Sequence, residues 1–280
     1  MLAIIFWGTS FIATKFLLYE ITPETIISMR LILGSSLLIV IALVTKNSFQ
    51  INFKNHGYIL LLAVIAVFHL WIQVTGLKYT TASNTGWIIG TAPVFMTVLA
   101  LAIFKEKIKF IQVAGIVIAL FGVLLLISKG EFNNIDLIEN KGDLMVLGSS
   151  FTWGVYSMVN KKISLTYSPL MTILFLFLMM ALIIIPFNIN EAVLKSILNL
   201  SFTGWGAILF LGFLCSGAGY VIWAQALRDL DSAKVGAFLY FEPLVTVIAA
   251  WLLLNESITI LMIVSGLVIT GGVLLVNKEV

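Results

Sequence analysis

The sequence contains little of what soluble enzymes and secreted domains depend on. It has a single cysteine, Cys215, which excludes an intramolecular disulfide and which we interpret as a small packing residue. Its two histidines, His56 and His69, are too few and too far apart in the chain to indicate a metal site. Only 10% of the 280 residues are charged, whereas a soluble domain carries about 25%. A soluble, disulfide-rich or metal-centred fold is therefore not predicted.

The motifs of common catalytic sites are also missing. The chain contains no H-E-x-x-H zinc motif, no G-x-S-x-G nucleophile turn, no Walker phosphate loop and no C-x-x-C pair. The net charge of +3 comes without a long basic run, so nucleic acid is not an expected partner. We therefore predict no catalytic residue, no cofactor and no bound metal, and a protein that is not an enzyme.

Hydrophobic residues are abundant instead, at 61% of the chain, and they fall into long blocks. About 20 apolar residues cross a bilayer as a helix, so the blocks predict an all-α integral membrane protein with ten transmembrane helices. The expected spans are 1–19, 24–44, 57–77, 82–104, 109–128, 142–161, 169–187, 203–226, 233–254 and 258–277. The first block has no basic leader and no small-residue cleavage site, so we interpret it as a span and not as a signal peptide.

Lysine and arginine residues predict the orientation in the cell membrane. If both termini are cytoplasmic, the cytoplasmic connections hold Lys46, Lys54, Lys105, Lys107, Lys109, Lys161, Lys162, Arg228, Lys234 and Lys278. The outer connections and nearby helix ends then hold Lys15, Arg30, Lys78, Lys129, Lys141 and Lys195. Basic residues favour the cytoplasmic side, so we expect the N-terminus and the C-terminus in the cytoplasm.

An internal repeat divides the chain into two halves. A shift of 146 residues places Trp7 on Trp153. Beyond the third span, a shift of 150 residues places Pro93 on Pro243, and the string "GVLL" recurs at the same shift. Several matches in the same order are not expected by chance, so the two halves are predicted to share one design.

Each half contains five expected spans, an odd number, so the second half must enter the membrane in the opposite direction. We predict two inverted five-helix repeats, residues 1–128 and 142–280, joined by a loop at 129–141 and packed around a central cavity. Inverted repeats around a site at mid-membrane recur in secondary transporters, where two related halves can exchange roles.

Charged residues that recur in both halves are interpreted as scaffold. Glu106 and Glu256 occupy equivalent positions before the next span, where a carboxylate satisfies free backbone N–H groups of that helix. Lys15 and Lys161 recur near helix ends, where a lysine can reach the lipid headgroups. Arg30 has no such counterpart; its place near a helix end favours a salt bridge or a headgroup contact.

Glu242 is the only ionisable residue of its long apolar run, within "LYFEPLVT" (239–246). The neighbouring Pro243, like Pro93, is predicted to bend its helix. Ala92 occupies the position equivalent to Glu242, so the bend does not need a carboxyl. An intramembrane charge costs about 2.5–3.5 kcal/mol or more unless it is paired or hydrated. We therefore predict that Glu242 faces the cavity; the alternative is a protonated carboxyl bonded to a carbonyl that Pro243 releases.

Further polar and aromatic residues follow helical spacing and are predicted to line a substrate path. They are His69 and Gln73 on the third span, Asn84 and Trp87 on the fourth, Trp153, Tyr156 and Asn160 on the sixth, Tyr220 and Trp223 on the eighth, and Phe238 on the ninth. The alternative for such stripes is packing between helices, which we favour for Ser10 and Thr14. His69 is either a proton relay or a hydrogen-bonded packing residue.

Four segments resemble the EamA-type branch of the drug/metabolite transporter superfamily. They are "FWGTSFIATKFL" (6–17), "SMRLILGSSLL" (28–38), "GLKYTTAS" (76–83) and "FEPLVTVIAAWLLLNESIT" (241–259). The resemblance covers nearly the whole chain; "LNES" (254–257) departs from it, because the family usually has a glycine before this glutamate. It implies a ten-helix bundle whose first, third, fourth, sixth, eighth and ninth helices surround a path for small metabolites.

The resemblance predicts a secondary-active exporter of small metabolites such as amino acids or related amines, working by alternating access. The expected partners are a small-molecule substrate, the lipid bilayer and protons as a candidate coupling ion. The loops are too short for an ATPase domain, so transport would draw on a gradient or on substrate flux. The alternatives are a flippase of lipid-linked substrates with the same fold, and an intramembrane enzyme that uses Glu242 as acid or base.

Overall fold

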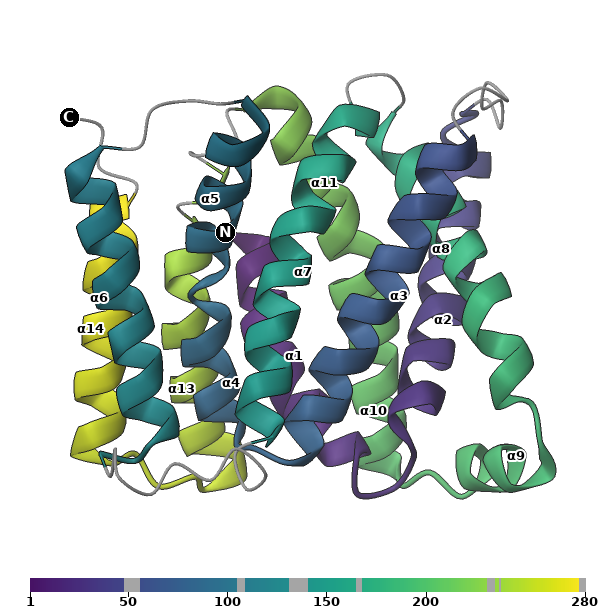
Figure 1. The fold of residues 1–280 in the computed structure, drawn as a ribbon. Coiled ribbons are helices and arrows are strands. Elements are labelled where there is room, and N and C mark those ends of the chain that lie inside the picture. The colour runs from purple at the N-terminus through teal and green to yellow at the C-terminus, as the bar shows by residue number, and fades with distance from the viewer. Residues whose placement is uncertain are drawn as a thin grey trace.

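The structure is a computed structural model, and it describes residues 1–47, 56–104, 109–130, 141–164, 168–230, 235–236 and 238–276. In these ranges all regular secondary structure is helical, as the composition predicts. Most helices stand side by side and share one axis direction (Figure 1). The predicted scaffold residue Glu106, the predicted cytoplasmic Lys54, Lys105, Lys107, Lys234 and Lys278, and most of the connecting loop lie outside the described residues.

The first half contains α1 (Leu2–Leu17), α2 (Pro23–Val44), α3 (His56–Lys78), α4 (Ala82–Ile89), α5 (Ala92–Phe104) and α6 (Phe110–Ile127). The second half contains α7 (Lys141–Ser164), α8 (Pro169–Ile184), the 3-10 turn η3 (Ile185–Asn188), α9 (Glu191–Leu198), α10 (Phe202–Leu209), the π-helix η4 (Phe210–Ala218), α11 (Gly219–Asp229), the 3-10 turn η5 (Phe238–Phe241), α13 (Glu242–Leu254) and α14 (Ile260–Val276). Each expected span coincides with one of these elements or with consecutive ones.

The length and composition of the apolar helices are those of a membrane protein. Four helical runs in the described ranges are long and apolar enough to cross a bilayer, namely 23–44, 57–78, 169–188 and 202–229. Shorter apolar helices occupy 2–17, 110–126, 242–254 and 260–275. Large apolar side chains such as Val40, Phe121, Trp251 and Leu267 are exposed on the outside of the bundle. Such a surface is stable against lipid chains and not against water.

Matching residues begin the second span and the seventh. Pro23 and Pro169 stand in the first turn, where a missing N–H costs nothing. The hydroxyls of Thr22 and Ser168 directly before them accept a backbone N–H three residues further on. The same start signal therefore serves the same helix of each half.

The fourth and ninth spans are interrupted next to Pro93 and Pro243. α4 ends at Ile89, and α5 begins after a short break with Pro93 in its first turn. η5 likewise passes into α13 with Pro243 in its first turn. The two breaks touch each other, because a Cβ added to Gly90 would lie 2.9 Å from the Pro243 Cγ. The α-helical pattern is thus interrupted next to both prolines, where the sequence predicts helix bends.

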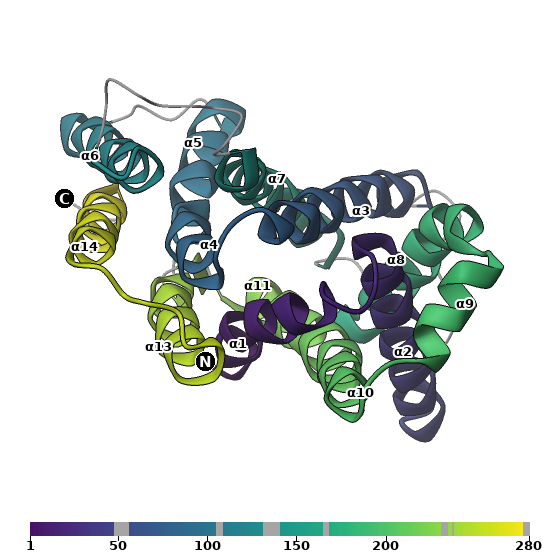
Figure 2. The same ribbon diagram turned by 90° about the horizontal axis from the view of Figure 1, so that it is seen from below.

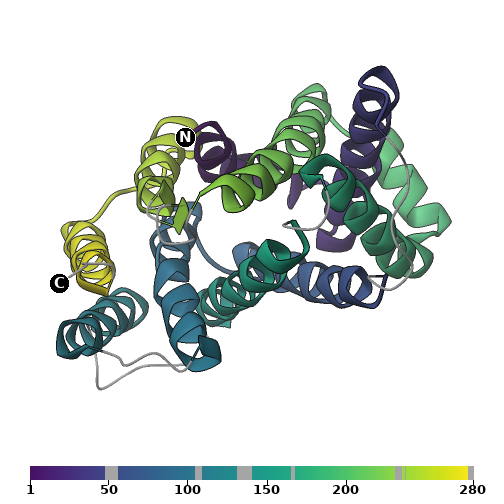
Figure 3. The same cartoon turned by 90° about the horizontal axis from the view of Figure 1, so that it is seen from above.

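The helices form two facing rows. Seen from below, α3, α7 and α5 lie in one row and α10, α1 and α13 in the other, with α6 and α14 at one end and α2 and α8 at the other (Figure 2). The view from above shows the same arrangement (Figure 3). α3 packs against α7 and α1 packs against α10, η4 and α11, while α6 pairs with α14 and α4 with α13. The centre of the protein lies between the rows.

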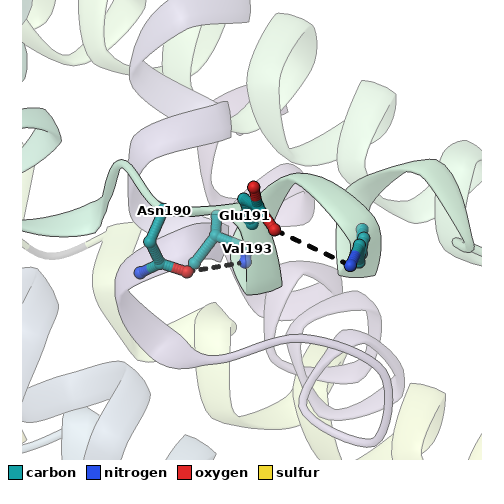
Figure 4. A network of polar contacts seen from close by, with 4 residues as sticks. Asn190, Glu191 and Val193 are labelled. Atoms are coloured by element: carbon teal, nitrogen blue, oxygen red, sulfur yellow. Dashed lines mark hydrogen bonds and ion pairs between the residues drawn. The ribbon is translucent and has the colours of Figure 1, made fainter.

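The short helix α9 was not expected from the sequence. It lies across the lower end of the bundle, at its edge (Figure 1). The Asn190 Oδ1 accepts the Val193 N–H at 2.9 Å, and an exposed ion pair joins Glu191 and Lys195 at 3.8 Å (Figure 4). The flanking aromatic residue Phe202 is 96% exposed. A short amphipathic helix with such a neighbour suits the membrane–water interface.

Candidate functional site

A cavity lies between the two rows of helices. It contains about 400 Å³ of space that no atom occupies, counting its open mouth. Its lining residues come from seven spans: Trp7, Ser10 and Phe11 of α1, Arg30 of α2, His69, Leu70 and Gln73 of α3, Ile89 of α4, Trp153 of α7, Tyr220 of α11 and Glu242 of α13. The six helices that the family resemblance implies all contribute, and α2 joins them.

Glu242 begins α13 and places its side chain in this cavity. The side chain is only 4% exposed, and its carboxyl has no hydrogen-bond or ion-pair partner in the described part of the chain. The alternative of a carboxyl bonded to a carbonyl near Pro243 is therefore not what this structure contains. Close packing fixes the position, because a Cβ added to Gly8 of α1 would lie 3.1 Å from the Glu242 carbonyl oxygen.

Arg30 also lines the cavity, and here the sequence-based interpretation is wrong. Its side chain is 4% exposed and its Nε donates a hydrogen bond to the Ser216 Oγ at 3.1 Å. It forms no salt bridge within the described residues and lies inside the bundle, away from lipid headgroups. A signal was present: Arg30 falls on Leu176 in the repeat, so it is as unshared as Glu242.

The partner of Arg30 comes from an unusual stretch of helix. Ser216 belongs to η4, whose π-helical turns hold more residues than α-helical ones and occur often at functional sites. α2 approaches η4 closely, since a Cβ added to Gly212 would lie 2.5 Å from the Leu33 Cβ. The glycine and the wide turns together bring the Ser216 hydroxyl to the guanidinium.

His69 lies on α3, in the row of α3, α7 and α5, and its side chain is hydrogen-bonded to α7. Its Nδ1 lies 3.0 Å from the Ser149 carbonyl oxygen and 3.2 Å from the Thr152 Oγ1. A carbonyl can only accept, so Nδ1 is the donor and carries a proton. Gln73 follows one turn later on the same helix and also lines the cavity. The geometry accounts for His69 as a hydrogen-bonded packing residue, and a proton relay through it stays a prediction.

Five aromatic side chains, here named the aromatic cluster, gather beside the cavity: Trp7, Trp153, Tyr156, Tyr220 and Trp223. The Trp7 ring lies 5.1 Å from Trp153, 5.6 Å from Tyr220 and 5.4 Å from Trp223, measured between ring centroids. Tyr156 stacks on Trp153 at 5.0 Å. The Trp7 Nε1 donates to the Cys215 carbonyl oxygen at 3.0 Å, which holds the central ring in place.

Five of the predicted path residues line the cavity: Glu242, Trp153, Gln73, His69 and Tyr220. The prediction missed Trp7, Phe11, Arg30, Leu70 and Ile89, and it assigned Ser10 to helix packing. Ser10 instead borders the cavity while its hydroxyl donates to the Trp7 carbonyl oxygen at 2.7 Å. Trp7 could have been found, because its repeat counterpart Trp153 was already a candidate.

Tyr156, Asn160 and Trp223 lie behind the cavity and not on its surface. All three are buried, and the rings of Tyr156 and Trp223 pack against Trp153 with centroids 5.0 and 5.7 Å away. The Asn160 Nδ2 donates to the Tyr156 hydroxyl at 3.4 Å. Helical spacing identifies the inner face of α7 and α11 correctly, but large rings in front separate these three residues from the open space.

Asn84, Trp87 and Phe238 also lie outside the lining. Asn84 donates to the Asp143 carboxylate at 3.3 Å, and the Trp87 ring packs where a Cβ of Gly266 on α14 would be. Phe238 is 40% exposed on the outside of the bundle. It precedes Glu242 by four residues, but η5 is a 3-10 turn with about three residues per turn, so this spacing does not bring the two side chains to one face.

Glu256 caps a helix, but not the helix that we expected. The backbone N–H groups of Ala82 and Ser83 donate to its two carboxylate oxygens at 2.9 and 3.0 Å, and the Ser83 hydroxyl adds a third bond at 2.7 Å. The capped helix is therefore α4 in the other half, and not the following α14. The left-handed backbone of Asn255, with φ of 53°, reverses the chain and turns the carboxylate toward α4.

The same end of the bundle contains three further hydrogen bonds. The Lys15 Nζ donates to the carbonyl oxygens of Leu77 and Thr80 at the end of α3, so Lys15 is not free to reach the headgroups as predicted. Asp143 at the start of α7 accepts from the Thr80 hydroxyl. Together with Glu256, these contacts form the lower network, which joins α1, α3, α4, α7 and the α13–α14 turn.

Comparison with known proteins gives one consistent result. The family described as the EamA-like transporter family matches residues 1–128 and 140–278. An uncharacterized transporter of Archaeoglobus fulgidus is 30% identical over 99% of this chain and 96% of its own length. Proteins named probable amino-acid metabolite efflux pump, from Escherichia coli and Salmonella typhimurium, are 27% and 26% identical over 97% of this chain and 91% of theirs. A crystal structure at 17% identity shares the fold with a TM-score of 0.68, covering 98% of this chain and 93% of that one.

Proposed function

Since this chain belongs to the EamA-like transporter family, we propose that it is a secondary-active exporter of small metabolites such as amino acids or related amines. The observation that carries the proposal is Glu242, a carboxyl without a partner among the described residues, buried in the central cavity. A buried, unpaired carboxyl in a membrane protein is expensive, and binding a solute or a proton compensates for it. Export is favoured by the efflux pumps to which the chain is similar.

Alternating access is supported by the way the helices pair. The contact between the third and sixth spans, α3 with α7, has its counterpart in the contact between the eighth and first, which joins η4 and α11 to α1. The pairs α6–α14, α2–α8 and α4–α13 each join equivalent helices of the two halves. Inverted halves that pair in this way can exchange conformations, so that the site opens to one side and then to the other.

We place both termini in the cytoplasm of a cell whose plasma membrane holds the protein. The described ends of α2, α5 and α7 and the starts of α3, α6 and α8 lie at the upper end in Figure 1, so the helix ends assigned to the cytoplasm fall on one side. The lower network then lies at the outer end. In this arrangement its polar contacts join helices on the outer side, which suits a protein that accepts its substrate from the cytoplasm.

The proposed exporter differs from the two alternatives, a flippase and an enzyme, in the substrate it takes or in what it does to that substrate. A flippase must accommodate a lipid-linked group, whereas the cavity is small and is bordered by aromatic rings that suit a compact organic solute. The family and the names of the relatives indicate a transporter and not an enzyme. Protons remain a candidate coupling ion, because Glu242 can bind one.

The test is efflux from liposomes that contain the purified protein. Liposomes are loaded with a mixture of amino acids and amines, and the external solution is sampled over time by mass spectrometry. We expect the loss of some solutes to exceed the loss from protein-free liposomes at least severalfold, and Glu242→Gln to reduce this difference strongly. Glu191→Gln on the surface of α9 is the matched control and should behave as the wild type.

Three other outcomes would contradict the proposal. Chemically altered solutes would favour an enzyme. Movement of a lipid-linked substrate between leaflets, without movement of soluble metabolites, would favour a flippase. Efflux that is unchanged in Glu242→Gln would remove the carboxyl from the mechanism.

A further inference from the structure

Two side chains of opposite charge line the central cavity without pairing with each other. Arg30 extends from α2 and Glu242 from α13. No ion pair joins them, and the hydrogen bond that the Arg30 side chain makes within the described residues goes to the neutral hydroxyl of Ser216. The guanidinium has five N–H donors and Nε uses one, so its NH₂ groups remain available toward the cavity. The carboxyl of Glu242 is equally available.

Keeping two charges apart in a membrane protein is costly. Each charge loses hydration, and the simplest relief would be a direct salt bridge between the two. The structure does not contain this relief, since no ion pair joins the two side chains within the described residues. Close packing holds the elements that carry them: Gly8 sets the start of α13 against α1, and Gly212 sets η4 against α2, each where a Cβ would meet its neighbour at 3.1 Å or less. The cation and the carboxyl thus line one cavity, and each keeps polar atoms available to a solute.

Tyr220 lines the same cavity as Arg30 and Glu242. Its ring centroid lies 5.6 Å from Trp7 and 6.0 Å from Trp153, so an apolar aromatic wall borders the cavity that holds the two charges. A solute that bridges the two charges would have this wall beside it.

We propose that Arg30 and Glu242 bind the two ends of one zwitterionic solute, an α-amino acid. Its carboxylate accepts hydrogen bonds from the Arg30 guanidinium, its ammonium donates to the Glu242 carboxylate, and its side chain lies against the aromatic wall. The inference rests on the proposed transport function and narrows its substrate class. An amine without a carboxylate, or a carboxylate without an amine, leaves one buried charge unpaired and is rejected.

The first experiment compares charge forms of one carbon skeleton with the wild-type protein. Efflux from loaded liposomes is measured with an equimolar mixture of the twenty amino acids. The best-transported amino acid is then compared with its decarboxylated amine and its deaminated carboxylic acid. We expect each analogue to be transported roughly 10- to 100-fold more slowly, because each lacks one charge-assisted hydrogen bond to the protein. Equal transport of either analogue would overturn the proposal.

The second experiment asks whether the two residues act on different ends of the solute. Glu242→Gln should lower transport of the amino acid and remove the preference over the carboxylic acid. Arg30→Gln should lower it as well and remove the preference over the amine, while Arg30→Lys retains part of the activity. A purely structural role would lower all three solutes equally and would contradict the proposal. Size-exclusion chromatography and tryptophan fluorescence establish that each variant is folded; if one is not, the wild-type comparison decides alone.

Failure of this inference is distinguishable from failure of the proposed function. If the wild type exports metabolites with a single charge or none, and no zwitterion, the proposed transport function is supported and the binding of a zwitterion by Arg30 and Glu242 is wrong. If the wild type moves no soluble metabolite at all, both are wrong.

Discussion

Trp7 and Trp153, which occupy equivalent positions in the two halves of the sequence, touch each other at the centre of the protein. Their ring centroids lie 5.1 Å apart and their planes meet at 83°, an edge-to-face contact. Both rings also border the cavity. Residues that the repeat relates are thus brought together where the halves meet, and either half can change the shape of the cavity through this contact.

The first prediction concerns the size of that cavity. Trp153→Leu removes an aromatic ring that faces the open space, so bulkier solutes should be transported relatively faster by severalfold. Trp223→Leu removes a ring behind the wall and should instead destabilise the protein, by about 3 kcal/mol as for large-to-small changes in a core. Relative efflux rates of small and large amino acids, together with thermal melting, separate the two effects. The same selectivity change in both variants would contradict the assigned positions.

The second prediction concerns Glu242 and protons. Ala92 at the equivalent position of the first half starts α5 beside Pro93 without a carboxyl, so Glu242→Gln should keep the helix break and fold normally. If protons drive export, the wild-type rate should rise with an imposed pH gradient and the variant should lose this response, because a proton can drive only a state that it binds differentially. Transport at two imposed gradients measures it. A variant that keeps the wild-type pH response would exclude Glu242 as the coupling site.

The third prediction tests the close approach of α2 and η4. Gly212→Ala should destabilise the protein by about 1–3 kcal/mol, because its Cβ would lie 2.5 Å from the Leu33 Cβ. Transport should fall as well, since the change moves Ser216 relative to Arg30. Gly206→Ala is the control, as a Cβ there meets nothing within 4 Å. Thermal melting of both variants in detergent is the measurement, and equal melting temperatures would refute the packing argument.

The fourth prediction concerns the lower network. Glu256→Ala removes the acceptor for two backbone N–H groups and one hydroxyl at the start of α4, and it should cost about 1–2 kcal/mol in stability. It should also make the end of the bundle that holds the lower network easier to open. Tyr79 is exposed, so Tyr79→Cys introduces a thiol that a membrane-impermeant maleimide can label. This thiol should react faster in the Glu256→Ala variant than in a protein that keeps Glu256. Unchanged labelling would leave Glu256 as a helix cap without a role in opening.

The helices and their breaks could be predicted because local rules decide them. Apolar length sets the spans, and a proline within an apolar block interrupts the helix before it, as at Pro93 and Pro243. Glu242 could be found because an unshared charge in an apolar run stands out against the repeat. None of these inferences requires knowledge of which helices are neighbours.

The remaining site residues depend on tertiary contacts that the sequence does not display. The sequence predicts a salt bridge or a headgroup contact for Arg30, because that argument uses only distance along a helix, whereas its position here depends on η4 packing against α2. The true partner of Glu256 lies more than 170 residues away in the chain. Spacing identifies the inward faces of α7 and α11, but the predicted path residues Tyr156 and Trp223 do not line the cavity. Ring size, and not spacing, decides which side chain on such a face reaches the open space.

The continuous helical run from Phe202 to Asp229 has 28 residues, more than a bilayer requires. At about 1.5 Å per residue it measures roughly 40 Å, against a hydrocarbon core of about 30 Å, and such an excess is accommodated by tilting. η4 occupies the middle of this run and holds Ser216. We therefore expect the acyl chain length of the surrounding lipids to change the angle of this helix and, through Ser216, the position of the Arg30 guanidinium. Membrane thickness should then affect the transport rate.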